Sequence, residues 1–234
     1  MKRFFGKIEG KMAKVDGEEF QHLKTVLRLK IDDEIIVLDG SENEFECKIV
    51  EMKKDAALCE IQRVEKCKAL AQKNIVLFQA LTKREKLELI TQKAVELGVK
   101  KMLPFSSEYC VAKDAIGKKD RLEKIVRGAC KQCECSVPME IGDTLKFSQM
   151  LKEAEKLDIV LFANERAGEN FDFSKLKNFS NIGIIVGPEG GFTEKEKEEI
   201  ARSGAESITL GRRILRSETA SIVLIGLVSI ESGN

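Results

Sequence analysis

The sequence predicts an α/β protein in which a domain with a parallel sheet follows a smaller, β-rich domain. Two observations predict this fold class. The chain changes near residue 70 from short, closely spaced β-like segments to an alternation of strands and helices, and two glycine loops each follow one of the later strands. With 43% hydrophobic and 34% charged residues among 234, the chain has enough apolar side chains to build a large core.

The first 68 residues have the pattern of a small sheet or barrel. The run DEIIVLDG ends in Asp39-Gly40 and the alternating run EFECKIVEM follows it, which is a hairpin signal. A third run, AALCEIQRVE, comes next. The segment EEFQHLKTVLRLK has apolar residues at helical spacing, which predicts a helix with one apolar face. These apolar residues are Phe20, Leu23, Val26 and Leu27.

Strands and helices alternate from residue 72 onward, after the linker segment EKCKALAQK. The runs NIVLFQA, VKKMLPF, DIVLFAN, IGIIV and SITL have the length and apolar character of buried strands. Helices are expected over TKREKLELITQKAVELG, which Gly98 ends, and at about 119–135. This alternation predicts a parallel sheet with helices on both faces.

Composition and cysteine usage indicate a reduced, aqueous compartment. No run approaches the roughly 20 apolar residues of a membrane-spanning helix, and MKRFFGKIEGKMAKVDG lacks the apolar stretch of a secretory signal. Seven cysteines, an odd number, fit free thiols better than a disulfide framework. We therefore expect a cytoplasmic protein with no membrane partner.

The first glycine loop, IVGPEGGFTEKE (185–196), follows a predicted strand, where open α/β sheets bind ligands. Thr193 and Glu196 form a capping-box pattern that starts the next helix. The loop lacks both the Lys-Ser/Thr pair of a phosphate-binding loop and the G-x-G-x-x-G fingerprint. Glu189 would repel a phosphate, so we expect a neutral or cationic ligand, held by backbone groups that the glycines leave uncovered. The alternative is a tight turn that binds nothing.

The second loop, LGRRILRSETA, lies between a predicted strand and a strongly apolar helix. Ser217 is expected to cap this helix at its N-terminus. The helix is apolar on nearly all sides from Ile222 to Ile230, which predicts a core position shared with a subunit interface. Arginines cluster beside Gly211, which favours a site, although solvent-facing charges are the alternative. These arginines are Arg212, Arg213 and Arg216.

Together, VGPEGGFTEKE and LGRRILRSETA resemble the signature loops of the ribosomal RNA small-subunit (16S) uridine-N3 methyltransferases, in the SPOUT superfamily of knotted methyltransferases. The resemblance covers almost the whole chain. HLKTVLRLKIDDEIIVLDG is similar to the family's PUA-like barrel, and ITQKAVELGVKKMLPFSSEYC, ACKQCECSVPMEI and LFANERAG match further blocks in the same order. KQC at 131–133 and FAN at 162–164 depart from the commonest form, which leaves the roles of Lys131 and Asn164 open.

The resemblance implies a PUA-like RNA-binding β-barrel over residues 1–68 and a SPOUT-type parallel-sheet domain with a C-terminal trefoil knot over 72–234. It implies a homodimer that binds S-adenosylmethionine and methylates N3 of a uridine in 16S ribosomal RNA, on the assembled small ribosomal subunit. The cofactor carries a positive sulfonium and no phosphate, which is compatible with an acid in the loop. By the match, the cofactor contacts Phe162, Ala163, Gly187, Glu189, Gly190, Gly191, Leu210, Gly211, Arg213, Ile214, Leu215 and Thr219.

Two residues are candidates for the chemistry. Methylation at N3 requires loss of the imide proton, and Glu189 is a candidate general base by its location. The alternative is that Glu189 accepts hydrogen bonds from backbone amides. Arg216 could stabilise the developing uridine anion or bind a phosphate.

The resemblance also implies that Arg3, His22 and Arg28 position the RNA. Residues 1–30 carry eight Lys/Arg against four Asp/Glu, which is compatible with a phosphate-binding face. A solvated Lys/Glu-rich surface is the alternative for that charge. His22 could instead pack locally, and Arg28 could pair with a carboxylate such as that of Asp32 or Asp33.

The cysteines at 130, 133 and 135 have C-x-x-C-x-C spacing, which is found among zinc ligands. A fourth ligand is missing nearby, although Cys110 could approach in the fold. On a helix, Cys130 and Cys133 can pack as small apolar groups. We expect no metal.

Two other functions fit the same residues. One is a SPOUT enzyme that acts on a different RNA or base, which identification of the modified nucleotide would reveal. The other is an RNA-binding protein that keeps the fold without catalysis, for which titration would show no binding of S-adenosylmethionine.

Overall fold

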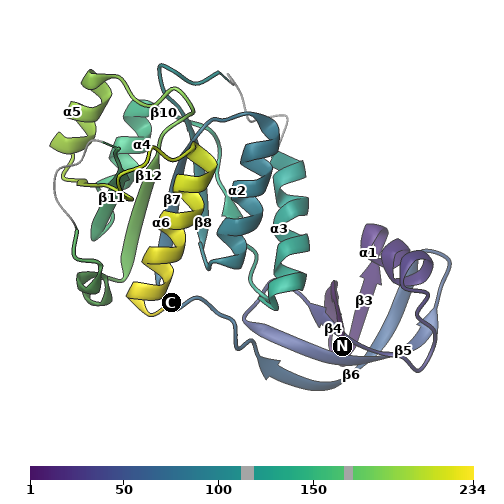
Figure 1. The fold of residues 1–234 in the computed structure, drawn as a ribbon. Coiled ribbons are helices and arrows are strands. Elements are labelled where there is room, and N and C mark those ends of the chain that lie inside the picture. Colours follow the sequence, from purple (N-terminus) through teal and green to yellow (C-terminus); the bar gives the residue numbers. More distant parts are fainter. Residues whose placement is uncertain (112–118, 166–170) are drawn as a thin grey trace. The chain divides into compact units, whose positions relative to one another are not determined.

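The computed structural model describes residues 1–111, 119–165 and 171–234. Contacts divide the chain into two compact units (Figure 1). The first comprises Met1–Leu70 together with Cys130–Pro138, and the second comprises Ala71–Ala129 together with Met139–Asn234. Nothing in the sequence indicated that Cys130–Pro138 groups with the first unit.

The first unit contains a six-stranded sheet with the order β1-β4-β5-β6-β3-β2. β1 pairs in parallel with β4, and the other neighbours are antiparallel. The predicted hairpin at Asp39-Gly40 is confirmed, because β4 and β5 pair on either side of it. The strands are β1 (Lys2–Phe5), β2 (Lys7–Glu9), β3 (Met12–Asp16), β4 (Glu34–Leu38), β5 (Asn43–Met52) and β6 (Ala56–Lys66).

The helix of this unit changes its winding partway. α1 (Gly17–Gln21) continues directly as a π-helical turn over His22–Val26. Phe20 and Leu23 are fully buried in the core of the unit, as predicted, but Val26 is 66% exposed. The prediction for Val26 was wrong because the wider π turn rotates this residue off the face expected at α-helical spacing.

All paired strands of the second unit run parallel, as the alternation predicted. Their order is β10-β8-β7-β12-β11-β13, with β9 beside β8, so that β12 is flanked by β7 and β11. The strands are β7 (Asn74–Ala80), β8 (Lys101–Ser106), β9 (Glu140–Ile141), β10 (Leu145–Lys146), β11 (Ile159–Ala163), β12 (Asn181–Val186) and β13 (Glu206–Ile208).

Helices cover both faces of this sheet (Figure 1). They are α2 (Arg84–Glu96), α3 (Lys119–Cys133), α4 (Phe147–Ala154), the 3-10 helix η3 (Phe173–Asn178), α5 (Glu194–Arg202) and α6 (Ser217–Ser232). Met150 of α4 and Ile200 of α5 pack with Phe78, Phe105 and Phe162 on one face. α2 and α6 lie side by side on the other face. Within the described ranges, no helix has the length and apolar character needed to cross a membrane.

Candidate functional site

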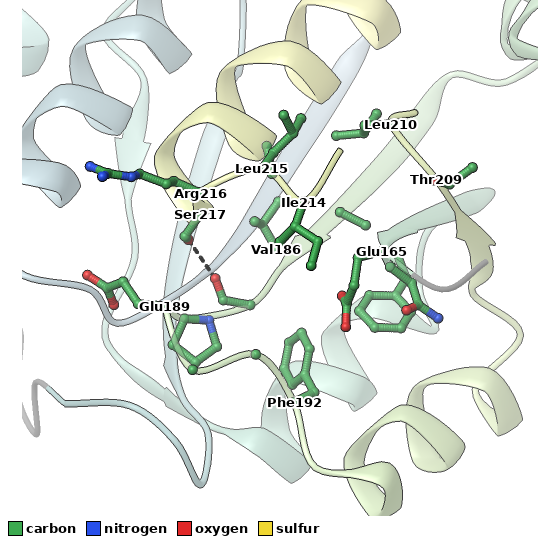
Figure 2. A pocket seen from close by; sticks show the side chains of 18 of the residues that line it. Glu165, Val186, Glu189, Phe192, Thr209, Leu210, Ile214, Leu215, Arg216 and Ser217 are labelled. Carbon is green, nitrogen blue, oxygen red and sulfur yellow. Dashed lines mark hydrogen bonds between the residues drawn. The ribbon is translucent and has the colours of Figure 1, made fainter. Parts of the chain in front are cut away.

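A pocket with a cavity volume of about 430 Å³ lies at the carboxyl ends of β11, β12 and β13. The loop after β12, the loop between β13 and α6, and the start of α6 all contribute to its walls. Parallel α/β sheets bind ligands at this edge. All of the predicted cofactor residues except Thr219 line the pocket, which Figure 2 shows from close by. Thr219 is an exposed residue of α6.

The first glycine loop ends in a fixed helix start. The backbone N–H of Glu196 donates to Thr193 Oγ1 at 3.1 Å, and the N–H of Thr193 donates to Glu196 Oε2 at 2.9 Å, which confirms the predicted capping box. Glu196 Oε1 also accepts a hydrogen bond from the N–H of Glu108 at 2.9 Å. The end of the loop is therefore anchored both to α5 and to the segment after β8.

Phe192 forms one wall of the pocket. Its ring is 5.3 Å from the ring of Phe162, edge to face, and is stacked on Phe105 at 6.1 Å, measured between centroids. A Cβ added to Gly187 would lie 2.8 Å from the Phe192 ring, closer than real contacts allow. A side chain at position 187 would therefore force the Phe192 ring or the loop to move.

Ser217 joins the second loop to the first. Arg216 is the N-cap of α6 and Ser217 lies in the first turn, so the prediction that Ser217 caps the helix was wrong. Its Oγ donates instead to the carbonyl oxygen of Gly187 at 2.6 Å (dashed in Figure 2). Gln79 Nε2 donates to Ser217 Oγ at 3.4 Å, and Ser221 Oγ donates to Gln79 Oε1 at 2.6 Å. These groups connect β7, α6 and the glycine loop.

The Glu189 carboxylate is occupied by groups of the protein itself. Its Oε1 accepts a hydrogen bond from the backbone N–H of Lys83 at 3.3 Å and lies 3.3 Å from Lys86 Nζ. Burial would raise the pKa of this carboxyl, but hydrogen bonds from the loop backbone, Lys83 and Lys86 together hold the pKa below its ordinary value. A carboxylate that donors hold in its ionised form is a weak base. This geometry favours the alternative in which Glu189 accepts hydrogen bonds from backbone amides.

Three charged residues that the sequence analysis did not select also line the pocket. The carboxylate of Glu165, which follows β11, lies between Ile214 and Phe192, on the opposite side from Glu189 (Figure 2). Lys197 Nζ from α5 lies 3.7 Å from Glu165 Oε1. The third residue is Lys86 of α2. No local pattern marks either lysine as part of a site.

The arginines of the second loop divide into two groups. Arg213 and Arg216 are exposed and line the pocket, whereas Arg212 is exposed and lies outside the lining. All three side chains face solvent, as the alternative stated, and Arg213 and Arg216 also contribute atoms to the pocket wall. Figure 2 shows the Arg216 side chain extending away from Ile214 and Phe192.

The three predicted RNA-positioning residues lie in the first unit. Arg3 is only 12% exposed at its side chain and pairs with Glu44 at 3.4 Å and Glu134 at 2.8 Å. His22 is half-buried, with its ring edge to face against Phe4 at 6.1 Å, so the local packing given as its alternative is present.

Arg28 is exposed and has a positive φ of 54°. The Asp32 carboxylate, one of its alternative partners, pairs with Lys48 Nζ at 2.8 Å. Arg28 is therefore the most accessible of the three predicted RNA-positioning residues.

The cysteine that approaches Cys130 and Cys135 is Cys67, and Cys110, considered as a possible fourth member, contacts Ser107 instead. Hydrogen bonds from the thiols of Cys130 and Cys67 lower the pKa of Cys135 to about 6, against the effect of burial. Cys67 Sγ also donates to the carbonyl oxygen of Glu134 at 3.3 Å, and Cys110 Sγ lies 3.3 Å from Ser107 Oγ. Across the residues that the structure describes, no three His, Cys, Asp or Glu side chains are arranged as a metal site.

Cys135 is expected to be the cysteine that iodoacetamide alkylates fastest at neutral pH. A pKa of about 6 leaves the reactive thiolate populated above that pH, so the rate should fall as the pH drops through 6. Burial raises the pKa of Cys47 to about 12 and that of Cys59 to about 11, so both should react slowly. Peptide mass spectrometry over a pH series measures the three rates. A midpoint for Cys135 near the ordinary thiol value of about 8.5 would contradict the prediction.

Comparison with known proteins shows the family of the domain that contains the pocket. The profile of the RNA methyltransferase domain matches residues 69–229, and the profile of the RNA methyltransferase PUA domain matches residues 15–62. The chain belongs to the RNA methyltransferase family. The pocket residues fall within the RNA methyltransferase domain, and the predicted α/β fold with its PUA-like N-terminal domain is confirmed.

Individual members of the RNA methyltransferase family are similar along most of their length. Ribosomal RNA small subunit methyltransferase E of Rickettsia conorii is 35% identical, over 89% of this chain and 85% of the relative. The structure of the Neisseria gonorrhoeae enzyme of the same name, bound to S-adenosyl methionine, superposes with a TM-score of 0.86 at 27% identity and covers 98% of this chain and 97% of that one. A Legionella pneumophila protein solved with the bound cofactor SAM gives a TM-score of 0.89 at 27% identity and covers 97% and 96%.

Proposed function

We propose that this chain transfers the methyl group of S-adenosylmethionine to N3 of a uridine in 16S ribosomal RNA of the assembled small subunit. One observation carries the proposal: the two glycine loops, predicted separately from the sequence, line a single pocket in a chain of the RNA methyltransferase family. The names of the relatives, ribosomal RNA small subunit methyltransferase E, support the substrate class. A cytoplasmic location is part of the proposal, because ribosomal RNA is the substrate.

The pocket fits S-adenosylmethionine in size and in the groups it offers. Its volume of about 430 Å³ falls in the range of roughly 300–1,000 Å³ typical of ligand pockets. Phe162, Leu210 and Ile214 offer apolar contacts for an adenine ring, and the carboxylate of Glu165 suits a cationic group. When bound, the cofactor supplies an electrophilic methyl group. The chain's own task is to hold the target base in line and to keep water out.

Arg216 is proposed as the residue that contacts the reacting base. Arg216 lines the pocket, and its guanidinium offers a positive charge with hydrogen-bond donors in a planar fork. A fixed cation beside O2 or O4 of uridine stabilises the anion that forms when N3 loses its proton. Glu189 was the candidate base, but its carboxylate contacts the N–H of Lys83 and the ammonium of Lys86. We therefore propose that Glu189 anchors the glycine loop.

The proposed activity is tested by transfer from methyl-labelled cofactor, with the purified chain, to 30S subunits and to naked 16S RNA in parallel. Labelled 3-methyluridine from the subunits, and little from the naked RNA, is the expected result. Label at another nucleoside would replace the substrate proposal by a different RNA target. Absence of cofactor binding would favour the non-enzymatic alternative.

We also propose the homodimer and the trefoil knot of the SPOUT family. α6 exposes an apolar stripe on one side: Val223, Leu227 and Ile230 are 39%, 36% and 75% exposed. Their spacing places them on one helix face, and unpaired apolar stripes mark protein interfaces. A second copy of the chain, bearing the same stripe, is the proposed partner.

Leu227→Asp is expected to shift the chain from dimer to monomer, because a carboxylate would be buried without a partner at the interface. Light scattering after size exclusion, at several protein concentrations, measures this shift. Val50→Asp is the matched control, since Val50 is 41% exposed on β5 of the other unit and should leave the mass unchanged. A Leu227→Asp chain that keeps the wild-type mass would exclude this face.

A further inference from the structure

One ammonium group joins three separate segments beside the pocket. Lys86 Nζ of α2 lies 3.3 Å from Glu189 Oε1 in the glycine loop and 3.1 Å from Glu218 Oε2 in the first turn of α6. The three side chains are mostly buried, at 24%, 23% and 14% exposed for Lys86, Glu189 and Glu218. Water therefore screens these contacts less than it screens an ordinary surface ion pair.

All three segments contribute residues to the pocket. Glu189 is part of the loop at Gly187–Phe192, Glu218 follows directly on Arg216 and Ser217, and Lys86 itself lines the cavity. The hydrogen bond from Ser217 Oγ to Gly187 joins the loop to α6 at a second point. Of these two contacts between the loop and α6, the one through Lys86 also involves α2.

The charges of Lys86, Glu189 and Glu218 link this contact to the position of the glycine loop. Two carboxylates contact one ammonium, so removal of the lysine charge would leave Glu189 and Glu218 facing each other across a partly buried space. The backbone N–H of Lys83 would remain with Glu189, and Arg216 lines the same pocket. Burial opposes the charge of Lys86, but the hydrogen bonds to Glu218 and Glu189 raise its pKa above the ordinary value, so the ammonium persists at working pH.

We propose that Lys86 is a positioning residue, which holds the glycine loop in its ligand-binding position by neutralising Glu189 and Glu218 together. The inference rests on the proposed function, in that the ligand is S-adenosylmethionine. Lys86 does its work through the two carboxylates.

Calorimetric titration of the full-length chain with S-adenosylmethionine tests this role. Lys86→Met should weaken binding about tenfold, because the two carboxylates would then repel each other across a partly buried space. Lys86→Arg, which keeps the charge, should stay within about threefold of wild type.

The double variant Lys86→Met/Glu218→Gln removes the repulsion and should restore binding to within about threefold of wild type. If Lys86→Met does not fold, the affinity of this double variant provides the test. Lys93→Met is the matched control, because Lys93 is on the same helix and pairs at 2.8 Å with Glu96 of that helix.

Each result has one meaning. Wild-type affinity in Lys86→Met, or a loss that the double variant does not repair, overturns the positioning role. Failure of the wild-type chain to bind the cofactor would instead overturn the proposed function, so the two failures can be told apart.

Discussion

Gly190→Val is expected to abolish methyl transfer, with cofactor affinity reduced by more than about 100-fold, while the chain still folds. A Cβ at position 190 would lie 2.9 Å from the Cβ of Tyr109 and 3.4 Å from its carbonyl oxygen. The added side chain would therefore push the glycine loop away from the segment after β8, which Glu108 and Glu196 hold in place. Calorimetric titration with S-adenosylmethionine and circular dichroism measure the two parts of this prediction.

Two variants separate this mechanism from a general loss of stability. Gly128→Ala in α3 adds a Cβ that meets no atom within 4 Å, so binding should not change. Tyr109→Gly in the Gly190→Val background removes the contacted Cβ and should recover part of the affinity. Full wild-type binding by Gly190→Val alone would show that the loop does not form the cofactor site.

Arg216→Ala is expected to lower kcat about 100-fold, because under the proposed role the developing anion on uridine would lose a stabilising cation. Cofactor affinity should change by less than about threefold, since the guanidinium is assigned to the base rather than to the methyl donor. Single-turnover methyl transfer to 30S subunits, measured together with cofactor titration, separates the two quantities.

Arg212→Ala provides the matched control for this prediction. Arg212 lies in the same loop and is equally charged, but it does not line the pocket. It should keep kcat within about twofold of wild type, apart from any general loss of RNA affinity. Equal losses in Arg212→Ala and Arg216→Ala would mean that the loop binds phosphates and that Arg216 has no special role.

Local sequence signals predicted local structure well in this chain. The capping box at Thr193 and Glu196 and the hairpin at Asp39-Gly40 each depend on side-chain or backbone preferences within a few residues, and both are confirmed. The parallel sheet followed from the alternation of strands and helices. The convergence of the two glycine loops in one pocket was implied by the family resemblance and not by any local signal.

Contacts between distant segments could not be predicted in the same way. Ser217 has the residue type of an N-cap, but the carbonyl of Gly187 lies within reach of its hydroxyl and takes the hydrogen bond. Lys86 is one of many lysines in a Lys/Glu-rich sequence, and only the fold brings it to Glu189 and Glu218. Glu189 had no local explanation in the sequence, because its partners Lys83 and Lys86 are about a hundred residues away along the chain.

The position of β12 has a consequence for how the chain reaches its fold. β12 lies between β7 and β11 and pairs Asn181 with Asn74, so the interior of the sheet is completed by a segment far along the chain. Until residues 181–186 have been synthesised, β7 presents an open hydrogen-bonding edge on that side. Closing so long a loop costs chain entropy before any pairing is gained, so insertion of β12 should limit the refolding rate. A nascent chain that has made β7 but ends before β12 would be exposed to edge-to-edge aggregation, which makes the synthesis of the intervening residues, 81–186, the vulnerable period for this protein.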